Sequence, residues 1–146
     1  IVDNIDCFFQ EKGEFMIIHD WKRPWRITGN SSVYRFKLGA FPDLLPYFRK
    51  HFDEIRQKFR NEQAYLSWFV NEHGTLTYWN DTWCKSYKYH CLQKIPLAYF
   101  KPPVKPEGAK IIIFHGEINP PDAVNGGGGK WYRYVLPSDW IKEAWQ

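Results

Sequence analysis

The chain has 146 residues, enough for one hydrophobic core, and 25% of them are charged, as in an ordinary globular domain. The net charge of +4 is too small, and the basic residues too scattered, to indicate nucleic-acid binding, but it suits an anionic ligand such as a nucleotide diphosphate. No stretch is apolar enough to span a membrane. The cysteines form no Cys-x-x-Cys pair, so we expect no structural zinc site, no disulfide framework and a cytoplasmic location.

The first half of the chain alternates strand and helix patterns. Segments 14–20 and 32–36 read as strands, because the first is apolar and the second alternates apolar and polar residues. Pro42 and Asp43 are then expected to open one amphipathic helix with a core-facing stripe. That stripe consists of Leu44, Leu45, Phe48, Phe52, Ile55 and Phe59.

A second helix is expected from Glu62 to about Glu72, with Asn61 as its N-cap and Gly74 ending it. A short strand over 75–79 should follow. Together with the first half, these elements indicate a mixed α/β class.

The second half begins with a proline-rich extended loop over 101–108, which leads into a β-branched strand over 110–114. A terminal helix is expected over 138–145, with Ser138 as its N-cap. The four glycines of 126–129 indicate a mobile loop, which could be either a lid over a site or a plain surface connector.

A histidine follows the 110–114 strand directly, in the sequence Phe114-His115-Gly116. Ligands of open α/β sheets bind outside the carboxyl ends of the strands, so His115 is a candidate site residue. A histidine that is simply hydrogen-bonded at a strand end is the alternative. Aromatic residues make up 19% of the chain, and this excess favours a carbohydrate or nucleotide ligand, although most of the rings must belong to the core.

Four segments in a fixed order carry a family resemblance. They are Asn30-Ser31-Ser32-Val33, Glu62-Gln63, Ser86-Tyr87-Lys88, and Phe114-His115-Gly116 with Pro120. This order resembles the C-terminal half of GT-A type nucleotide-sugar glycosyltransferases, in particular the family that includes glycogenin and bacterial lipooligosaccharide galactosyltransferases. The resemblance implies a single partial domain over 1–146, the C-terminal part of a mixed-sheet GT-A domain, which lacks the nucleotide-binding half.

The resemblance also implies an activity, the metal-dependent transfer of a sugar from a nucleotide-diphosphate sugar to a glycan or other hydroxyl acceptor. Asn30, Ser31 and Glu62 would contact sugar hydroxyls, and the amide of Gln63 would lie near the reacting carbon as the catalytic group. Locally, Asn30 also reads as a turn residue after Gly29, and Glu62 as an acidic residue favoured at a helix start. Such a partial domain is expected to be inactive on its own.

In this family a histidine and an Asp-x-Asp motif bind Mn²⁺ or Mg²⁺. By resemblance His115 is the metal ligand, Gly116 lies beside the substrate, and the Asp-x-Asp would precede Ile1. The family's Lys-Pro-Trp triplet is replaced by Asn119-Pro120-Pro121, so Lys88 or Lys130 would have to supply the cation for the diphosphate. The alternatives are a non-catalytic carbohydrate-binding module and a scaffold of transferase-like fold.

Overall fold

The computed structural model describes residues 1–127 and 134–145, and it divides the chain into two compact units. The central unit is Gln10–Asp81, and the terminal unit combines Ile1–Phe9 with the chain from Thr82 onward. The chain is mixed α/β with small mixed sheets, which confirms the expected class. None of the described helices has the length and apolar character that a membrane crossing requires. The expectation of a single partial domain stays a prediction.

A small mixed sheet forms the centre of the central unit. Its strands β1 (Phe15–His19), β2 (Gly29–Phe36) and β3 (Leu76–Tyr78) lie in the order β2-β1-β3. β2 is antiparallel to β1, and β3 is parallel to it. The first four residues of β1 are buried, as expected of its apolar sequence. All three predicted strands are therefore present.

The prediction of one helix after Pro42 was wrong, because the chain forms α2 (Leu44–Lys50) and α3 (Phe52–Lys58). The backbone leaves helical geometry at His51, where φ is −113° and ψ is 30°. The His51 ring stacks on Tyr47 at 4.5 Å, and its Nδ1 lies 3.2 Å from Oε2 of Glu54. Only Ile55 of the expected stripe is fully buried.

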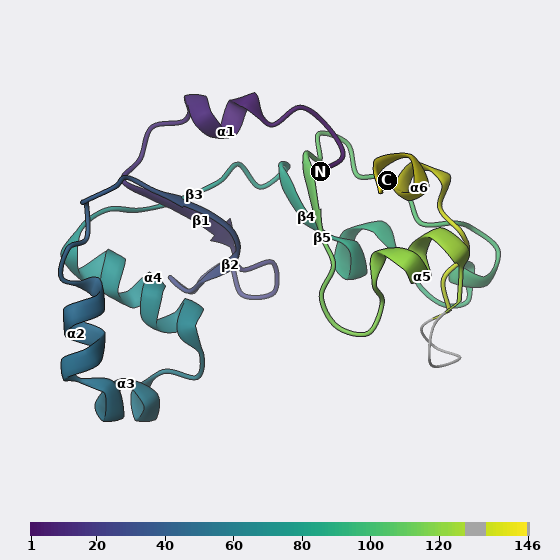
Figure 1. The fold of residues 1–146 in the computed structure, drawn as a ribbon. Helices are drawn as coiled ribbons and strands as arrows, with labels where there is room; N and C mark the ends of the chain where they lie inside the picture. The colour runs from purple at the N-terminus through teal and green to yellow at the C-terminus, as the bar shows by residue number, and fades with distance from the viewer. Residues whose placement is uncertain (128–133, 146) are drawn as a thin grey trace. The chain divides into compact units, whose positions relative to one another are not determined.

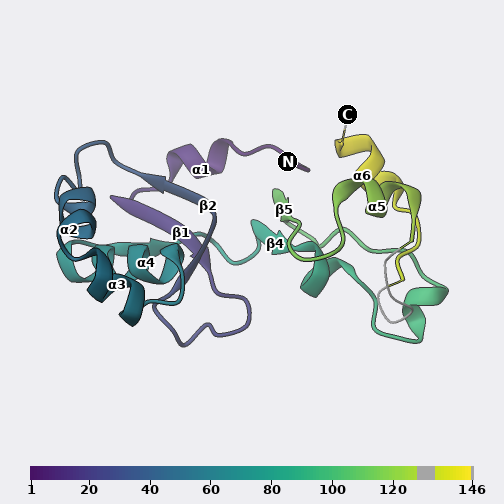
Figure 2. The ribbon, with the colours of Figure 1, turned by 60° about the horizontal axis from the view of Figure 1, so that its bottom comes forward.

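The helix α4 (Glu62–His73) begins and ends as its sequence predicts. The Asn61 side chain accepts a hydrogen bond from the Ala64 N–H at 3.1 Å, so it is a true N-cap. Val70 packs against the buried residues of β1, while Tyr65 and Phe69 pack against Ile55 of α3. α4 therefore lies between the sheet and the pair α2 and α3 (Figures 1 and 2).

The terminal unit is built on two parallel strands, β4 (Cys84–Ser86) and β5 (Ile111–Ile113). Its core consists of Tyr87, Cys91, Ile118, Ala123, Val135 and Ile141. The described part of this unit also contains most of α1 (Asp6–Gln10), the helices α5 (Pro120–Asn125) and α6 (Asp139–Ala144), a π-helical turn Tyr87–Cys91 and a 3-10 turn Leu97–Tyr99.

The strand over 110–114 and the terminal helix are present as predicted, with Ser138 at the N-cap position. The side chain of Ser138 makes no capping hydrogen bond, however. Of the expected glycine loop, Gly126 ends α5 and Gly127 pairs with Val135. The rest of that loop, and Lys130, lie outside the described residues.

Candidate functional site

An irregular pairing between β1 and β2 forms the first candidate site, in the central unit. Ile17 pairs with Tyr34, but the next residue, Ile18, pairs with Asn30. Residues 31–33 therefore have no partner on β1 and bulge out of the sheet. Gly29 precedes the bulge because a Cβ there would lie 2.6 Å from Cγ2 of Ile17, too close for any side chain.

The bulge is hydrogen-bonded to the first turn of α4. The Ser31 N–H donates to Oε1 of Gln63 at 3.2 Å, and the Ser31 hydroxyl donates to Oε1 of Glu62 at 2.9 Å. One turn further along α4, the Ser67 hydroxyl accepts from the Gly29 N–H at 2.9 Å and donates to the Gln63 carbonyl at 2.7 Å. These bonds gather Asn30, Ser31, Glu62 and Gln63, which we name the bulge cluster.

The bulge cluster retains hydrogen-bonding groups for a ligand. Backbone N–H groups determine the orientation of the side-chain amides of Asn30 and Gln63. The Ser32 N–H donates to Oδ1 of Asn30 at 3.0 Å, and the Ser31 N–H donates to Oε1 of Gln63. Within the described chain, no acceptor binds the amide nitrogens of Asn30 and Gln63, and no donor binds Oε2 of Glu62. The cluster thus offers two amide donors and one carboxylate acceptor.

His115 belongs to a second candidate site, in the terminal unit. β4 and β5 are parallel and pair Ser86 with Ile113, so Ser86 and His115 both lie at the carboxyl end of this sheet. The Ser86 Oγ lies 2.6 Å from Nε2 of His115 and also accepts from the Tyr89 N–H at 3.3 Å. We expect the hydroxyl to donate to Nε2, which places the hydrogen of the neutral imidazole on Nδ1.

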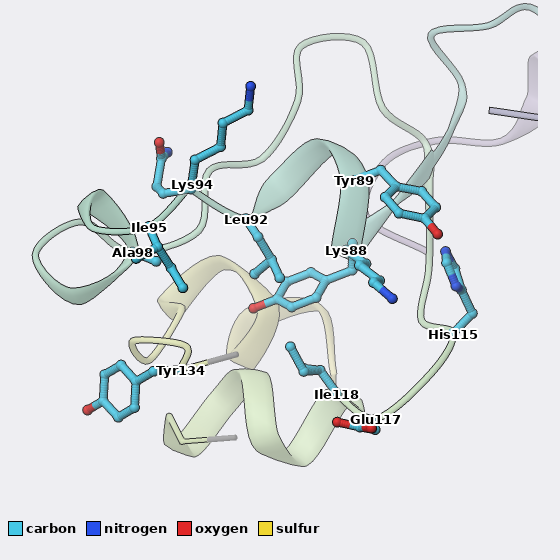
Figure 3. A pocket seen from close by; sticks show the side chains of 12 residues that line it. Lys88, Tyr89, Leu92, Lys94, Ile95, Ala98, His115, Glu117, Ile118 and Tyr134 are labelled. Carbon is cyan, nitrogen blue, oxygen red and sulfur yellow. The ribbon is translucent and has the colours of Figure 1, made fainter. Parts of the chain in front are cut away.

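The residues beside His115 shape its surroundings. Gly116 has a φ of +96°, in the left-handed region, and a Cβ there would meet nothing within 4 Å. Backbone conformation rather than space therefore favours glycine at this position. Lys88, in the π-helical turn, is exposed, and its Nζ lies 5.6 Å from the centroid of the Tyr89 ring. Figure 3 shows Lys88, Tyr89 and His115 around one end of a pocket.

The described residues alone do not make a metal site. Among residues 1–127 and 134–145, no three His, Cys, Asp or Glu side chains are grouped so that they could hold a metal ion. His115 is the single candidate ligand, and its Nε2 is bonded to Ser86. Asp3 is hydrogen-bonded to Nζ of Lys110 at 2.7 Å, which lowers the pKa of its carboxyl group. Binding of Mn²⁺ or Mg²⁺ stays a prediction, and we assign no chemical step to a metal.

The structure thus sorts the predicted site residues into two groups. Asn30, Ser31, Glu62 and Gln63 meet in the central unit, whereas Lys88, His115 and Gly116 belong to the terminal unit. Sequence reasoning gave no role to Ser67 and Ser86, whose hydroxyls hold the two groups in place. The sequence does carry one signal for Ser86, because a serine directly before a helical turn is a typical N-cap.

Comparison of the chain with protein-family models, with curated proteins and with solved structures finds no match. A function is therefore inferred from the geometry of the bulge cluster and of the residues around His115.

Proposed function

We propose that the chain is part of a GT-A type glycosyltransferase, which moves a sugar from a nucleotide-diphosphate sugar to a hydroxyl acceptor. The observation that carries the proposal is the bulge cluster. Ser31 lies 31 residues from Glu62 in the sequence, yet its hydroxyl and N–H bind the side chains of Glu62 and Gln63. Residues that the family resemblance nominates for sugar contact are therefore neighbours.

The chemistry of the bulge cluster suits a sugar. Each sugar hydroxyl both donates and accepts a hydrogen bond, so recognition needs donors and acceptors side by side. In the proposal the amides of Asn30 and Gln63 donate to sugar oxygens, and Oε2 of Glu62 accepts from a sugar hydroxyl. Gln63 is the group nearest the reacting carbon, and Ser31 holds its amide in one orientation.

In the terminal unit, considered by itself, the resemblance nominates residues for contact with a phosphate group. Lys88 supplies a positive charge, and Gly116 lets the backbone turn directly after His115. His115 would be one protein ligand of Mn²⁺ or Mg²⁺, whose chemistry is to stabilise negative charge on the leaving diphosphate. The remaining ligands are not found among the described residues.

A titration of the ¹⁵N-labelled chain tests the proposal. Backbone and side-chain amide shifts are followed while UDP-glucose, UDP-galactose, UDP or a methyl glycoside is added. We expect both nucleotide sugars to shift the amides of Asn30, Ser31 and Gln63, and UDP alone to leave them unmoved. Glu62→Gln should weaken this response about tenfold, since a hydrogen bond to a charged group contributes roughly 1.5–3 kcal/mol. Glu72→Gln, at an exposed position of the same helix, is the matched control.

The alternative functions give different outcomes. A non-catalytic carbohydrate-binding module would respond to the methyl glycoside or to longer glycans, with no gain from the nucleotide. A scaffold would respond to none of the four compounds. Equal binding by the Glu62→Gln and Glu72→Gln variants would remove the bulge cluster from the proposed site.

A further inference from the structure

The terminal unit contains a pocket of about 580 Å³ beside the turn that follows β5 (Figure 3). Small-molecule sites in proteins occupy roughly 300–1,000 Å³, so the pocket is large enough for a ligand. Its lining comes from two stretches of chain, 87–98 and 115–118, together with Tyr134. All of these residues belong to the terminal unit.

One end of the pocket is polar, and the lining as a whole carries two lysines, Lys88 and Lys94, against one carboxylate, Glu117. Lys88, Tyr89 and His115 lie together at the polar end, as Figure 3 shows. The Tyr89 ring lies 5.2 Å from the His115 ring, and Lys88 Nζ lies 5.6 Å from the Tyr89 ring centroid. Within the described part of the chain, Lys88 forms no ion pair. An anionic group of a ligand would therefore gain a charge-assisted contact with Lys88 without displacing a carboxylate.

The other end of the pocket is mostly apolar, although Lys94 also lies there, beside Ile95 (Figure 3). Figure 3 places Ile95, Ala98 and Tyr134 at this end, with Leu92 and Ile118 between the two ends. Ile118 is 8% exposed and belongs to the buried core of the unit, and Leu92 packs against that core. This wall is therefore fixed by the fold rather than by the ligand.

We propose that this pocket binds a small amphiphilic anion, a molecule with one anionic group joined to an aromatic or aliphatic body. The anionic group lies at Lys88, and the body packs on Leu92, Ile118 and Ala98 and against the ring of Tyr134. The inference goes beyond the proposed function and does not rest on it.

The experiment uses three probes that separate the two ends of the pocket. 1-Naphthyl phosphate carries both the anion and the body, 1-naphthol carries the body alone, and inorganic phosphate carries the anion alone. Affinities are measured by naphthyl fluorescence and by amide shifts of the ¹⁵N-labelled chain. We expect 1-naphthyl phosphate to bind at least tenfold more tightly than either partial probe, with shifts at 88–98 and 115–118.

Variants locate the contacts. Lys88→Gln should weaken 1-naphthyl phosphate about tenfold and leave 1-naphthol unchanged, while Lys142→Gln, on an exposed site of α6, should change neither. Ala98→Trp should fill the apolar end and abolish binding of both naphthyl probes. Tyr134 is 40% exposed, so Tyr134→Ser should weaken the same two probes without unfolding the chain.

Two results would overturn the inference. One is equal affinity for 1-naphthyl phosphate and 1-naphthol in the unaltered chain. The other is binding that is insensitive to Lys88→Gln, Ala98→Trp and Tyr134→Ser alike. Failure here is distinguishable from failure of the proposed function, because that function is measured at the bulge cluster with nucleotide sugars.

Discussion

The hydroxyl of Ser31 lies 2.9 Å from Oε1 of Glu62 and joins a bulged strand to the first turn of a helix. The bond exists because the bulge removes Ser31 from its place opposite β1 and leaves its polar groups unpaired by the sheet. The acidic side chain is itself favoured at the helix N-terminus by the macrodipole. Local propensity and pairing across the sheet therefore support the same arrangement.

Ser31→Ala removes this bond while leaving the backbone in place. We expect the free energy of unfolding to fall by about 1 kcal/mol or less, because the bond is exposed to solvent. Binding of a nucleotide sugar should weaken several-fold, since Glu62 loses the group that orients it. Urea denaturation and the amide-shift titration measure the two effects. Ser32→Ala is the matched control, because the Ser32 hydroxyl bonds to no residue in the described chain. Equal effects of the two changes would contradict the role of Ser31.

Asn61 and Ser138 stand at two helix starts that look alike in sequence, but their substitution by alanine should change the free energy of unfolding by different amounts. Asn61 caps α4 with a hydrogen bond at 3.1 Å, so Asn61→Ala should lower the free energy of unfolding by about 1 kcal/mol. Ser138 precedes α6, but within the described chain its side chain makes no capping hydrogen bond, so Ser138→Ala should cost less stability than Asn61→Ala. Chemical denaturation of the two variants decides the point. Comparable losses for both would show that Ser138 is a working cap.

The elements that sequence patterns predicted correctly depend on local signals. Asn61 and Gly74 mark the ends of α4, and the apolar run over 15–19 forms β1. The apolar periodicity of 44–59 predicted a single helix, and this prediction was wrong. The apolar spacing continues through His51, although the backbone departs from helical geometry there. Spacing alone does not reveal such a break.

The geometry of the candidate site depends on pairing between distant segments. The bulge at 31–33 is determined by how β2 aligns with Ile17 and Ile18, and no residue within the bulge encodes that alignment. The contact between Ser86 and His115 requires β4 and β5 to lie parallel in one register. Asn30, Ser31, Gln63 and His115 could therefore be nominated from the sequence, but Ser67 and Ser86 were given no role.

Ser86→Ala should change the tautomer of His115. The Ser86 hydroxyl lies 2.6 Å from Nε2 of His115, and we expect it to donate there and to leave the hydrogen of the neutral imidazole on Nδ1. Without this donor, the form with the hydrogen on Nε2 should become populated, and stability should fall by about 1–2 kcal/mol through the lost cap at Tyr89. Ring ¹⁵N shifts recorded at alkaline pH distinguish the tautomers.

Ser86→Thr, which keeps the hydroxyl, should retain the original tautomer. Unchanged ring shifts in Ser86→Ala would show that Ser86 is a cap for the turn and has no positioning role for His115.

The buried thiols of the terminal unit should make stability fall at alkaline pH. Burial raises the pKa of Cys84 and of Cys91 to about 12. In the unfolded chain the cysteine thiols ionise at about pH 8.5. Above that pH the unfolded chain therefore loses protons that the folded chain keeps. The stabilising contribution is therefore complete below about pH 8.5 and declines as the pH rises toward 12. Urea denaturation between pH 8 and 10.5 measures the decline, and Cys84→Ala should reduce its slope.

The same burial predicts selective alkylation. At pH 8, iodoacetamide should modify the half-buried Cys7 first and reach Cys84 and Cys91 only when the unit unfolds. The variant Cys7→Ser should have no fast-reacting thiol. Modification of Cys84 or Cys91 at the rate of Cys7 in the folded chain would contradict the burial of these side chains.

The most direct test of the account is to observe the sugar itself at the bulge cluster. Intermolecular nuclear Overhauser effects are recorded between UDP-glucose or UDP-galactose and the side-chain amides of Asn30 and Gln63. The account predicts contacts from sugar ring protons to both amides, lost in Glu62→Gln and retained in Glu72→Gln. Contacts confined to the uridine protons, or none at these amides while the nucleotide sugar is bound, would contradict it.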